Sequence, residues 1–339
     1  MHIEIITTPN EALKESGFGS LIACTSFLNA VKRLGHNARL HLCSTKEHLD
    51  KIIRIKPDLV IPAVKYIPVK EGDDIWLSDY FSQNEINFTG SSREILKFDS
   101  DKELAKKHLT LSGINTAAYF LAVPGQYKNE NELPLSFPLF LKPSDAANGN
   151  GIDDLSYVTS FEEYVSKLAS LYATFKQAVL VEQYLDGREF TVAVINTIDD
   201  KLSVSAVEVI PPKSTNGLRI LGAKTKKEDS EILKKIANSE IRNNVTQLAI
   251  NAFTALGVRD YGRFDIKTSK EGGCYFMEAN LVPGMTFGSS YFPQACIIEH
   301  ELAYIEVIEQ FIAGGLSRVE ANTSLNTPIS DSHPLIEAV

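Results

Sequence analysis

Polar side chains with the types and spacing of a metal site occur in the last third of the chain. Two segments rich in strand-forming residues, YGRFDIKT at 261–268 and CYFMEANL at 274–281, flank a short glycine-containing turn, which predicts an antiparallel hairpin. Side chains alternate between the faces of a strand, so Arg263 and Asp265 share a face, and a symmetric register places Asp265 opposite Glu278. The hairpin therefore presents four polar side chains on one face: Arg263, Asp265, Glu278 and Asn280.

The chemistry of this face suits a divalent cation. Two carboxylates opposite each other in a sheet repel unless a positive charge lies between them. Mg²⁺ binds carboxylate and amide oxygens and bridges substrate phosphates, so Asp265, Glu278 and Asn280 form a suitable ligand set. Arg263 beside them would counter developing negative charge. A solvated polar face is the competing interpretation, but the next segment, LVPGMTFGSS at 281–290, has the small residues that let backbone amides approach a ligand.

Length, composition and charge exclude several other classes of protein. A chain of 339 residues, 44% hydrophobic and 23% charged, is expected to be globular with about two or three domains. Acidic residues outnumber basic ones by 43 to 34, which argues against a nucleic-acid partner. No signal peptide or membrane span is recognisable, so we expect a cytoplasmic protein without membrane contacts. The four cysteines lack CxxC spacing, so neither a zinc site nor a disulfide framework is expected.

The elements that must position the hairpin divide into three units. Residues 1–93 alternate strand and helix signals, which predicts an N-terminal parallel α/β substrate domain. Residues 94–181 predict a small central α+β subdomain, and residues 182–318 a C-terminal subdomain that carries the metal-binding hairpin. Residues 319–339 are rich in Ser, Thr, Asn and Pro, which predicts a loosely ordered tail.

Within these units, the spacing of apolar residues sets the expected elements. The expected strands are 1–7, 38–43, 58–64, 86–90, 136–143, 178–185, 188–195, 202–210, 261–268 and 274–281. The expected helices are 19–34, 76–84, 97–113, 161–172 and 239–256. Asp99 or Ser100 is the expected N-cap of the third helix, which ends at Gly113. The polar, lysine-rich segment 211–229 predicts a mobile surface loop.

Five stretches between Phe88 and Gln294 resemble, in the same order, the signature sequences of the D-alanine–D-alanine ligases within the ATP-grasp superfamily. They are 88–116 (FTGSSREILKFDSDKELAKKHLTLSGINT), 137–152 (FPLFLKPSDAANGNGI), 179–194 (VLVEQYLDGREFTVAV), 261–268 (YGRFDIKT) and 277–290 (MEANLVPGMTFGSS). Several ordered motifs are more specific than any one of them. The resemblance implies a three-domain α/β (α+β) ATP-grasp fold with the nucleotide between the second and third domains, and a homodimer formed through the first.

The resemblance also implies a nucleotide site. It assigns two lysines, Lys102 and Lys142, to the phosphates and the loop at 145–151, which contains Asn148, to their cover. Ammonium groups and loop amides suit such an anion. By the same resemblance, Glu182 and the backbone of the following residues, including Tyr184 and Leu185, contact the adenine base. Glu189 is expected to hold the ribose hydroxyls. Phe264 and Met277 line the adenine slot, although core packing explains both equally well.

For the reacting groups, the resemblance assigns roles to a few further positions. Lys224 corresponds to a lid lysine that reaches the terminal phosphate, and Arg263 to the residue that stabilises a tetrahedral intermediate. The amides near Gly284 and the Ser289 hydroxyl receive a substrate carboxylate. Glu15 matches the acid that holds the first substrate's ammonium group, but an exposed glutamate at a helix start is common without any ligand.

The chain departs from the family pattern around the substrate. A histidine-glycine stretch of the first domain is replaced by PAVKYIPVKEGDDIW at 62–76, with Lys65 or Tyr66 at the histidine position. Asn148 replaces a serine, and Thr225 follows the lid lysine where a tyrosine is expected. These changes spare the nucleotide and metal residues and alter the acceptor pocket.

The sequence therefore predicts an ATP-dependent carboxylate–amine ligase that works through an acylphosphate. Its cofactors are ATP and Mg²⁺, expected as two ions that Mn²⁺ could replace, and its partners are small carboxylic acids or amino acids, expected not to be D-alanine twice. Two alternatives stay open: a genuine D-alanine–D-alanine ligase of peptidoglycan synthesis, and a non-catalytic ATP-binding regulatory protein. The second would have no need for Arg263.

Overall fold

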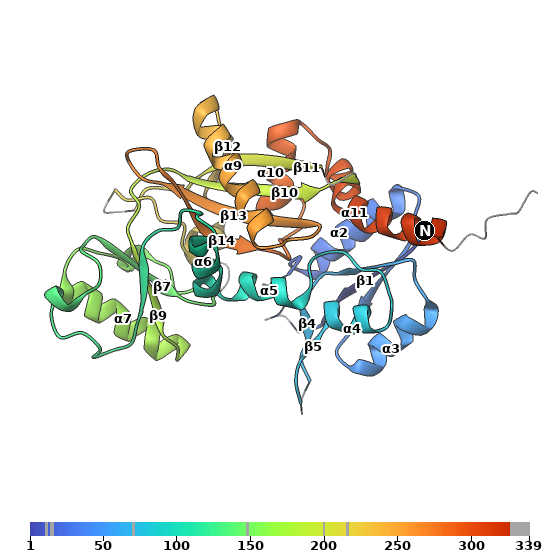
Figure 1. The fold of residues 1–339 in the computed structure, drawn as a ribbon, viewed down its shortest axis with the longest axis horizontal. Coiled ribbons are helices and arrows are strands. Elements are labelled where there is room, and N and C mark those ends of the chain that lie inside the picture. Colours follow the sequence, from blue (N-terminus) through green and yellow to red (C-terminus); the bar gives the residue numbers. More distant parts are fainter. Residues whose placement is uncertain are drawn as a thin grey trace, which may run out of the picture.

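Three regions follow one another along the long axis of the molecule (Figure 1). The computed structural model describes residues 1–10, 13, 17–69, 72–146, 149–198, 201–214 and 217–325. Each region is built around its own sheet, and the strand orders are β2-β1-β3, β6-β9-β7-β8 and β12-β11-β10-β13-β14, with a small β4-β5 hairpin. None of the helices in these ranges is long and apolar enough to cross a membrane.

The N-terminal region is the expected parallel α/β layer, but the strand expected at 86–90 is reduced to a single parallel bridge between Phe88 and Val60. Its strands are β1 (His2–Thr7), β2 (Asn37–Leu42) and β3 (Leu59–Pro62), and its helices are α2 (Leu21–Arg33), α3 (Lys46–Ile55) and α4 (Leu77–Gln83). Nearly every residue of β1 is buried, as parallel strands covered by helices require. The Ser20 side chain caps α2 by accepting a hydrogen bond from the Ala23 amide. Strands β4 (Tyr66–Ile67) and β5 (Ile75–Trp76) form a hairpin that projects from the body (Figure 1).

The central region begins with two helices where the sequence predicted one. Helix α5 (Arg93–Ser100) and helix α6 (Lys102–Leu111) are separated at Asp101, so the expected single helix with an Asp99 or Ser100 cap was wrong. Asp101 has an extended backbone, and its side chain accepts a hydrogen bond from the Leu104 amide. The new helix start places the next residue, Lys102, in the first turn of α6, beside the sheet that carries the hairpin.

A small antiparallel sheet completes the central region. It contains β6 (Tyr119–Ala122), β7 (Leu139–Pro143), β8 (Tyr157–Val158) and β9 (Val179–Gln183), with 3₁₀ turns at Glu130–Glu132 and Asp154–Ser156. Helix α7 (Phe161–Phe175) packs on it through a separate apolar core that includes Tyr164, Leu168 and Leu171. Strands β7 and β9 pair with each other, and this pairing sets Lys142 and Glu182 close together.

The C-terminal region is a five-stranded antiparallel sheet between helices. Its strands are β10 (Glu189–Asn196), β11 (Leu202–Ile210), β12 (Ile232–Lys235), β13 (Tyr261–Thr268) and β14 (Cys274–Asn280), and its helices are α8 (Ala223–Glu228), α9 (Ser239–Ala255), α10 (Tyr291–His300) and α11 (Tyr304–Leu325). Phe253 of α9 packs on Phe264, so α9 covers the face of the sheet opposite Arg263 and Asp265. Strand β12, α8 and α10 were not expected, and the predicted loop at 211–229 contains α8.

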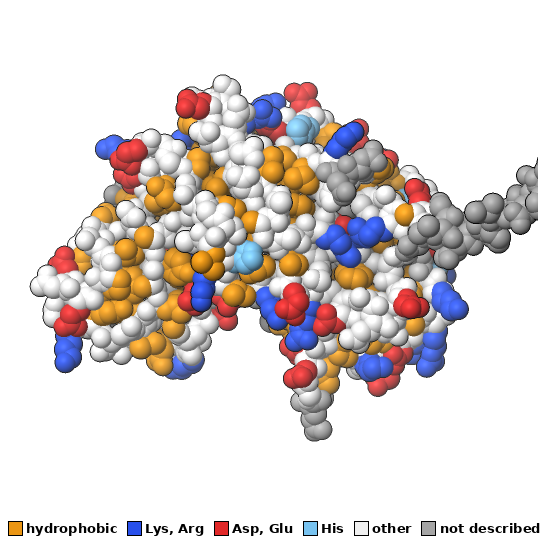
Figure 2. All heavy atoms as spheres, in the orientation of Figure 1, with side chains coloured by type: hydrophobic (Ala, Val, Ile, Leu, Met, Phe, Trp, Pro, Cys, Tyr) orange, Lys and Arg blue, Asp and Glu red, His pale blue; other side chains and the backbone are white. Residues whose placement is uncertain are grey.

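Helix α11 joins the C-terminal region to the N-terminal one. It lies beside α2 (Figure 1), and Arg318 Nη1 is 2.6 Å from Asp260 Oδ1, while the Gly90 amide donates to Asp260 Oδ2 at 2.7 Å. The predicted tail at 319–339 therefore begins inside a helix that runs to Leu325, and residues 326–339 lie outside the described part. Acidic and basic side chains are scattered over the face seen in Figure 2, without a basic stripe of the kind that binds nucleic acid.

Candidate active site

The hairpin of β13 and β14 has the register predicted from the sequence where it matters for the site. Asp265 pairs with Glu278 and Arg263 pairs with Asn280, so the four polar side chains lie on one face. Strand β10 on the other side of β13 adds Thr191, whose hydroxyl donates to Asp265 Oδ1 at 2.8 Å. The sheet itself therefore fixes the relative positions of these groups.

A β-bulge interrupts this hairpin directly beside the site. The register shifts between Asp265 and Ile266, because Ile266 pairs with Phe276 and Met277 has no partner across the hairpin. An extra residue in one strand lets two consecutive side chains point toward the same side. Met277 and Glu278 accordingly both line one pocket, while Phe276 is fully buried in the core.

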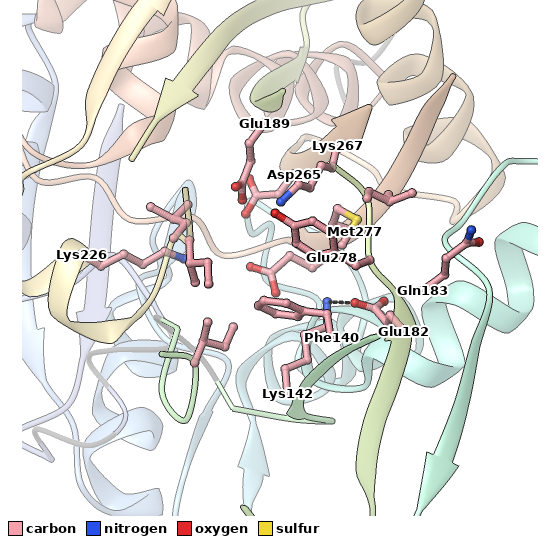
Figure 3. Close-up of a pocket in the computed structure, with 15 residues that line it drawn as sticks. Phe140, Lys142, Glu182, Gln183, Glu189, Lys226, Asp265, Lys267, Met277 and Glu278 are labelled. Carbon is pink, nitrogen blue, oxygen red and sulfur yellow. Dashed lines mark ion pairs between the residues drawn. The ribbon is translucent and has the colours of Figure 1, made fainter. Parts of the chain in front are cut away.

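A pocket of about 670 Å³, partly open to solvent, lies between the central and C-terminal sheets. Figure 3 shows Lys226 reaching into it from the side of α8, opposite Glu182 and Gln183. The residues that line it come from β7, β9, β10, β13, β14, helix α8 and three loop segments: Phe140, Lys142, Ile152, Glu182, Gln183, Tyr184, Leu185, Glu189, Ile220, Leu221, Lys226, Asp265, Lys267, Met277 and Glu278.

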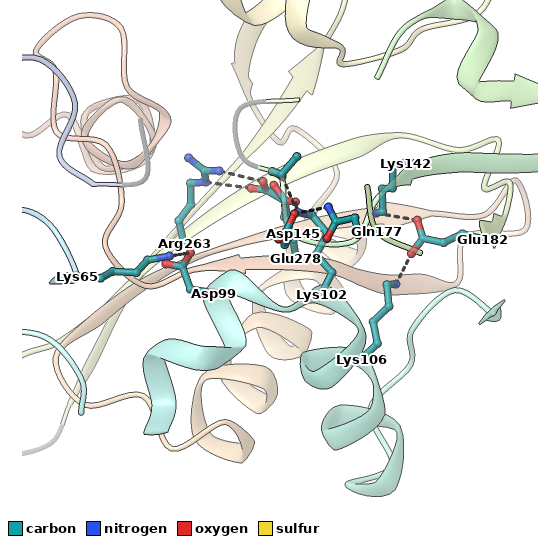
Figure 4. Close-up of polar contacts among 12 residues, drawn as sticks. Lys65, Asp99, Lys102, Lys106, Lys142, Asp145, Gln177, Glu182, Arg263 and Glu278 are labelled. Atoms are coloured by element: carbon teal, nitrogen blue, oxygen red, sulfur yellow. Dashed lines mark hydrogen bonds and ion pairs between the residues drawn. The ribbon is translucent and has the colours of Figure 1, made fainter. Parts of the chain in front are cut away.

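Glu182 lies between two lysines at the floor of this pocket (Figure 4). Its carboxylate is 2.6 Å from Lys106 Nζ and 2.7 Å from Lys142 Nζ, and all three side chains are buried. Burial acts to raise the pKa of Glu182, but the two ammonium groups hold it below its ordinary value. Both carboxylate oxygens are thus engaged by lysines.

Lys102, at the start of α6, contacts both the loop after β7 and the hairpin of β13 and β14. Its Nζ donates to the Ala146 carbonyl at 2.8 Å and lies 3.5 Å from Glu278 Oε2. Ala146 belongs to the loop expected to cover phosphates, and its Asn148 lies outside the described residues. Lys102 therefore connects that loop to the proposed metal ligands.

Glu278 and Glu189, two of the three glutamates that line the pocket, have opposite pKa shifts. Burial acts to raise the pKa of Glu278, but nearby cations, Lys102 first, keep it well below its ordinary value. For Glu189 burial dominates and raises the pKa, although Lys267 and Lys226 oppose this effect. Glu278 is therefore a permanent anion near neutral pH, as a metal ligand must be.

Arg263 is held at the inner end of the polar face. Its guanidinium makes two hydrogen bonds to Asp265, with Nε to Oδ1 at 3.1 Å and Nη2 to Oδ2 at 3.0 Å. It also lies over the Tyr291 ring, 5.4 Å from the centroid, and the Tyr291 hydroxyl donates to Glu231. Two hydrogen bonds to one carboxylate fix the orientation of the planar guanidinium, so its remaining N–H groups point in a fixed direction.

The residues present fit Mg²⁺ without forming a complete cage. In the described ranges, no three His, Cys, Asp or Glu side chains cluster as a metal site, so protein carboxylates alone do not saturate an ion. Mg²⁺ normally keeps waters and substrate phosphates beside one or two carboxylates. The buried Nδ2 atom of Asn280 also has no hydrogen-bond partner among these residues, and the amide's two ends are interchangeable by rotation. Asp265, Glu278 and Asn280 together suit an oxygen-loving ion.

Some of the other predicted site residues line the pocket and some do not. Tyr184, Leu185, Glu189 and Met277 line the pocket. Phe264 does not, because it is fully buried on the opposite face of β13, against Phe253. The pocket is lined by Lys226 in place of Lys224, which is exposed on α8. Glu15 lies outside the described residues.

The predicted substrate groups lie beyond Arg263, on the segment before α10. Ser289 Oγ is 3.3 Å and 3.4 Å from the two carboxylate oxygens of Asp229, to which it donates. At Gly284 an added Cβ would lie 2.8 Å from Ser290 Oγ, so the backbone there is closely packed. Neither residue lines the pocket of Figure 3.

Lys65 and Tyr66, the two candidates for the histidine position of the family, have different surroundings. Lys65 Nζ is 2.6 Å from Asp99 Oδ1, and Asp99 Oδ2 accepts hydrogen bonds from the Leu281 and Val282 amides at 2.6 Å and 3.2 Å. Lys65 is buried and Tyr66 is half-buried in the β4-β5 hairpin. Lys65 thus ties the first domain to the strand end that follows Asn280.

Several residues in or beside the pocket were not predicted from the sequence. Lys267 and Phe140 lie within predicted strands. The alternation of side chains assigns each of them to one face of its sheet but does not predict that it lines a pocket. Lys106 had one signal, because it lies four residues after Lys102 and hence on the same side of α6. Lys226 could not be separated from its neighbours in a lysine-rich segment.

Known proteins similar to this chain agree on one family. The model described as D-ala D-ala ligase C-terminus matches residues 109–313. The D-alanine–D-alanine ligase of Aquifex aeolicus (strain VF5) is 27% identical over 259 residues, which cover 76% of this chain and 82% of that protein. D-alanine–D-alanine ligase A of Escherichia coli (strain K12) is 26% identical over 291 residues, which cover 83% and 77%.

A solved structure shares the whole fold. The crystal structure of D-alanine–D-alanine ligase from Bacillus anthracis complexed with ATP superposes with a TM-score of 0.72 at 20% identity, over 95% of this chain and 99% of that chain. This likeness confirms the predicted α/β ATP-grasp class. Because the family match spans more than half of the sequence, the chain belongs to the D-ala D-ala ligase family of ATP-grasp ligases, which form carbon–nitrogen bonds.

Proposed function

We propose that this ligase uses ATP to activate a carboxylic acid as an acylphosphate and then joins it to an amine, with release of ADP and phosphate. The observation that carries the proposal is the single polar face of Arg263, Asp265, Glu278 and Asn280 beside a lysine-lined pocket. Electrostatic positioning is the main catalytic contribution available to a phosphoryl-transfer site.

The pocket is the proposed nucleotide site. Phe140, Ile220 and Met277 supply apolar walls for a base, and Glu189 stands where it could hold ribose hydroxyls. Lys142 and Lys226 supply positive charge for phosphates at the polar end. The predicted assignment of the lid lysine thus moves from Lys224 to Lys226.

Asp265, Glu278 and Asn280 are the proposed ligands of Mg²⁺. When bound, Mg²⁺ neutralises phosphate charge and orients the transferred group. That two such ions bind is a prediction from the family resemblance. Lys102 holds Glu278 from the side of the phosphate loop, and Arg263 holds Asp265 from the inner end, so both carboxylates are oriented before any ligand arrives.

The chain's own residues account for both chemical steps. A carboxylate is a poor electrophile, so one oxygen must become a phosphate leaving group before an amine can attack. Lys102, Lys142 and Lys226 share the negative charge of the transferring group. The amine then attacks the carbonyl, and the free N–H groups of Arg263 stabilise the tetrahedral oxyanion before phosphate leaves.

Helix α8 and the residues that lead into it, 217–222, form the proposed lid, which excludes water from this intermediate. The Ala223 amide donates to the Ile152 carbonyl at 3.2 Å, which docks α8 on the residue directly after the loop expected to cover phosphates. An added Cβ at Gly222 would lie 2.5 Å from the same carbonyl oxygen, so this contact needs glycine. An exposed acylphosphate would be hydrolysed, and closure prevents this.

We propose further that the preferred substrates are not two molecules of D-alanine. Lys65 with its Asp99 partner and Thr225 on the lid both differ from the family pattern at the substrate side. The second candidate is a genuine D-alanine–D-alanine ligase, which the names of the relatives favour.

One screen separates these two candidates. Purified protein is mixed with ATP, Mg²⁺ and pairs of amino acids or small carboxylates, phosphate release is recorded, and each product is identified by mass spectrometry. We expect the fastest pair to give an amide other than D-alanyl-D-alanine. If D-alanine alone gives the fastest release, the second candidate is correct.

A further inference from the structure

Lys106 is a fully buried cation that the proposed reaction leaves without a task. It lies on α6 and points at β9, with Nζ 2.6 Å from Glu182 and 3.4 Å from the Phe276 carbonyl oxygen. Its side chain is completely shielded from solvent, and it does not line the pocket. Burial of an ammonium group carries a large desolvation penalty unless a partner of opposite charge offsets it, so this position requires an explanation.

The arrangement around Glu182 is a row of three charges with a surplus. Lys106 and Lys142 approach opposite oxygens of one carboxylate, at 2.6 Å and 2.7 Å (Figure 4). Two positive charges and one negative charge leave a net charge of +1. Without Lys106, the Lys142–Glu182 pair would be neutral and would attract an anion weakly.

We infer that Lys106 is a positioning residue for the nucleotide: it satisfies Glu182 from behind, so that the charge of Lys142 stays available to phosphate. This inference rests on the proposed nucleotide site. Lys142 lines the pocket and Lys106 does not, so Lys106 acts only through the shared carboxylate. The ligand class that depends on it is a nucleoside di- or triphosphate, whereas an uncharged nucleoside does not.

The test is a charge-restoring pair of variants. Lys106→Met removes one positive charge and leaves the pair neutral. Lys106→Met combined with Glu182→Gln also removes the negative charge, so the net charge returns to +1 on Lys142 alone. Lys107→Met is the matched control, because it makes the same change at the exposed neighbouring position of α6. Dissociation constants of ATP, ADP and adenosine are measured for all four proteins by calorimetry, and circular dichroism checks folding.

We expect Lys106→Met to weaken ATP and ADP binding by about tenfold or more and to leave adenosine binding unchanged. The double variant should recover most of the lost affinity, and the control should match the wild type. A purely structural lysine would instead weaken all three ligands, and the second substitution would not help. Equal weakening of adenosine, or no recovery, overturns the inference.

A folding failure of the single variant does not block the test. The double variant has no buried carboxylate at this position, and its ratio of ATP to adenosine affinity can be compared with that of Glu182→Gln, which carries a net charge of +2. We expect the ratio to be larger for Glu182→Gln, and equal ratios would contradict the inference. Wild-type protein that binds no ATP would refute the proposed function itself, which is a separate outcome.

Discussion

At the scale of single residues, the site depends on side chains whose charges are fixed by their neighbours. Asp265 accepts three hydrogen bonds, from Thr191 and from two nitrogens of Arg263. Glu278 is kept anionic by the surrounding lysines and Arg263. Such groups need little reorganisation when charge develops, which is the property expected of a phosphoryl-transfer site.

Replacement of Arg263 by alanine should separate catalysis from nucleotide binding. The guanidinium lies at the end of the polar face, away from the base-binding walls, so we expect kcat to fall by about 10²–10³ while ATP affinity stays close to normal. Steady-state kinetics and calorimetry give the two quantities. Loss of ATP binding with intact turnover would contradict the assigned role, and Arg54→Ala, at an exposed position of α3, is the control.

The raised pKa of Glu189 predicts a pH effect on nucleotide affinity. Burial favours the neutral acid, so Glu189 takes up its proton at a higher pH than an ordinary glutamate. The protonated form is a poorer acceptor for ribose hydroxyls, and adenosine affinity should therefore fall on acidification before the pH reaches the ordinary range of glutamate. Adenosine carries no phosphate whose titration would interfere. The Glu189→Gln variant should bind with a flat pH profile, and an identical decline in both proteins would refute the assignment.

At the scale of elements, the contact between Gly222 and the Ile152 carbonyl oxygen should be sensitive to substitution. Gly222 packs against the Ile152 carbonyl oxygen with no room for a side chain. Gly222→Ala should hold α8 away from the phosphate loop, admit water and uncouple the reaction, so that phosphate release exceeds amide formation. The ratio of the two products measures this, and it should stay near one in the wild type. A coupled Gly222→Ala enzyme would show that the contact is dispensable. Gly217→Ala is the control: no neighbouring atom would meet its Cβ, although its φ of +77° adds some backbone strain.

Prediction from sequence succeeded for the hairpin because its signals are local. Period-two alternation and a glycine turn determined the pairs Asp265 with Glu278 and Arg263 with Asn280. The bulge at Met277 was not predictable, since no glycine or proline marks it, and it places Met277 in the pocket. Likewise, alternation could not tell that Phe264 packs on Phe253.

The helices show where local signals are ambiguous. Asp99, Ser100 and Asp101 are all good N-caps, and only the packing of α5 and α6 selects Asp101. Lys106 and Glu182 are far apart in the sequence, so their ion pair depends on the meeting of α6 and β9, which no short-range pattern encodes.

At the scale of the whole molecule, buried charge joins the first region to the third. Asp260 receives Arg318 from α11 and the Gly90 amide from the N-terminal region. Arg318→Ala should leave a buried carboxylate without its main partner and lower the free energy of unfolding by about 2 kcal/mol. Thermal denaturation would show this, whereas Arg93→Ala, which breaks an exposed pair with Asp79, should change stability by less than about 1 kcal/mol. Equal effects of the two substitutions would contradict this account. The predicted homodimer can be checked in the same samples by analytical ultracentrifugation.

The fate of one oxygen atom tests the central claim most directly. A carboxylic acid substrate labelled with ¹⁸O in both carboxyl oxygens is turned over with unlabelled ATP and Mg²⁺, and the phosphate released is analysed by mass spectrometry. Because the acylphosphate gives up the oxygen that was phosphorylated, the account predicts one ¹⁸O atom in each phosphate formed together with amide. Phosphate without the label would mean that the acid is never phosphorylated, and the proposed mechanism would be wrong.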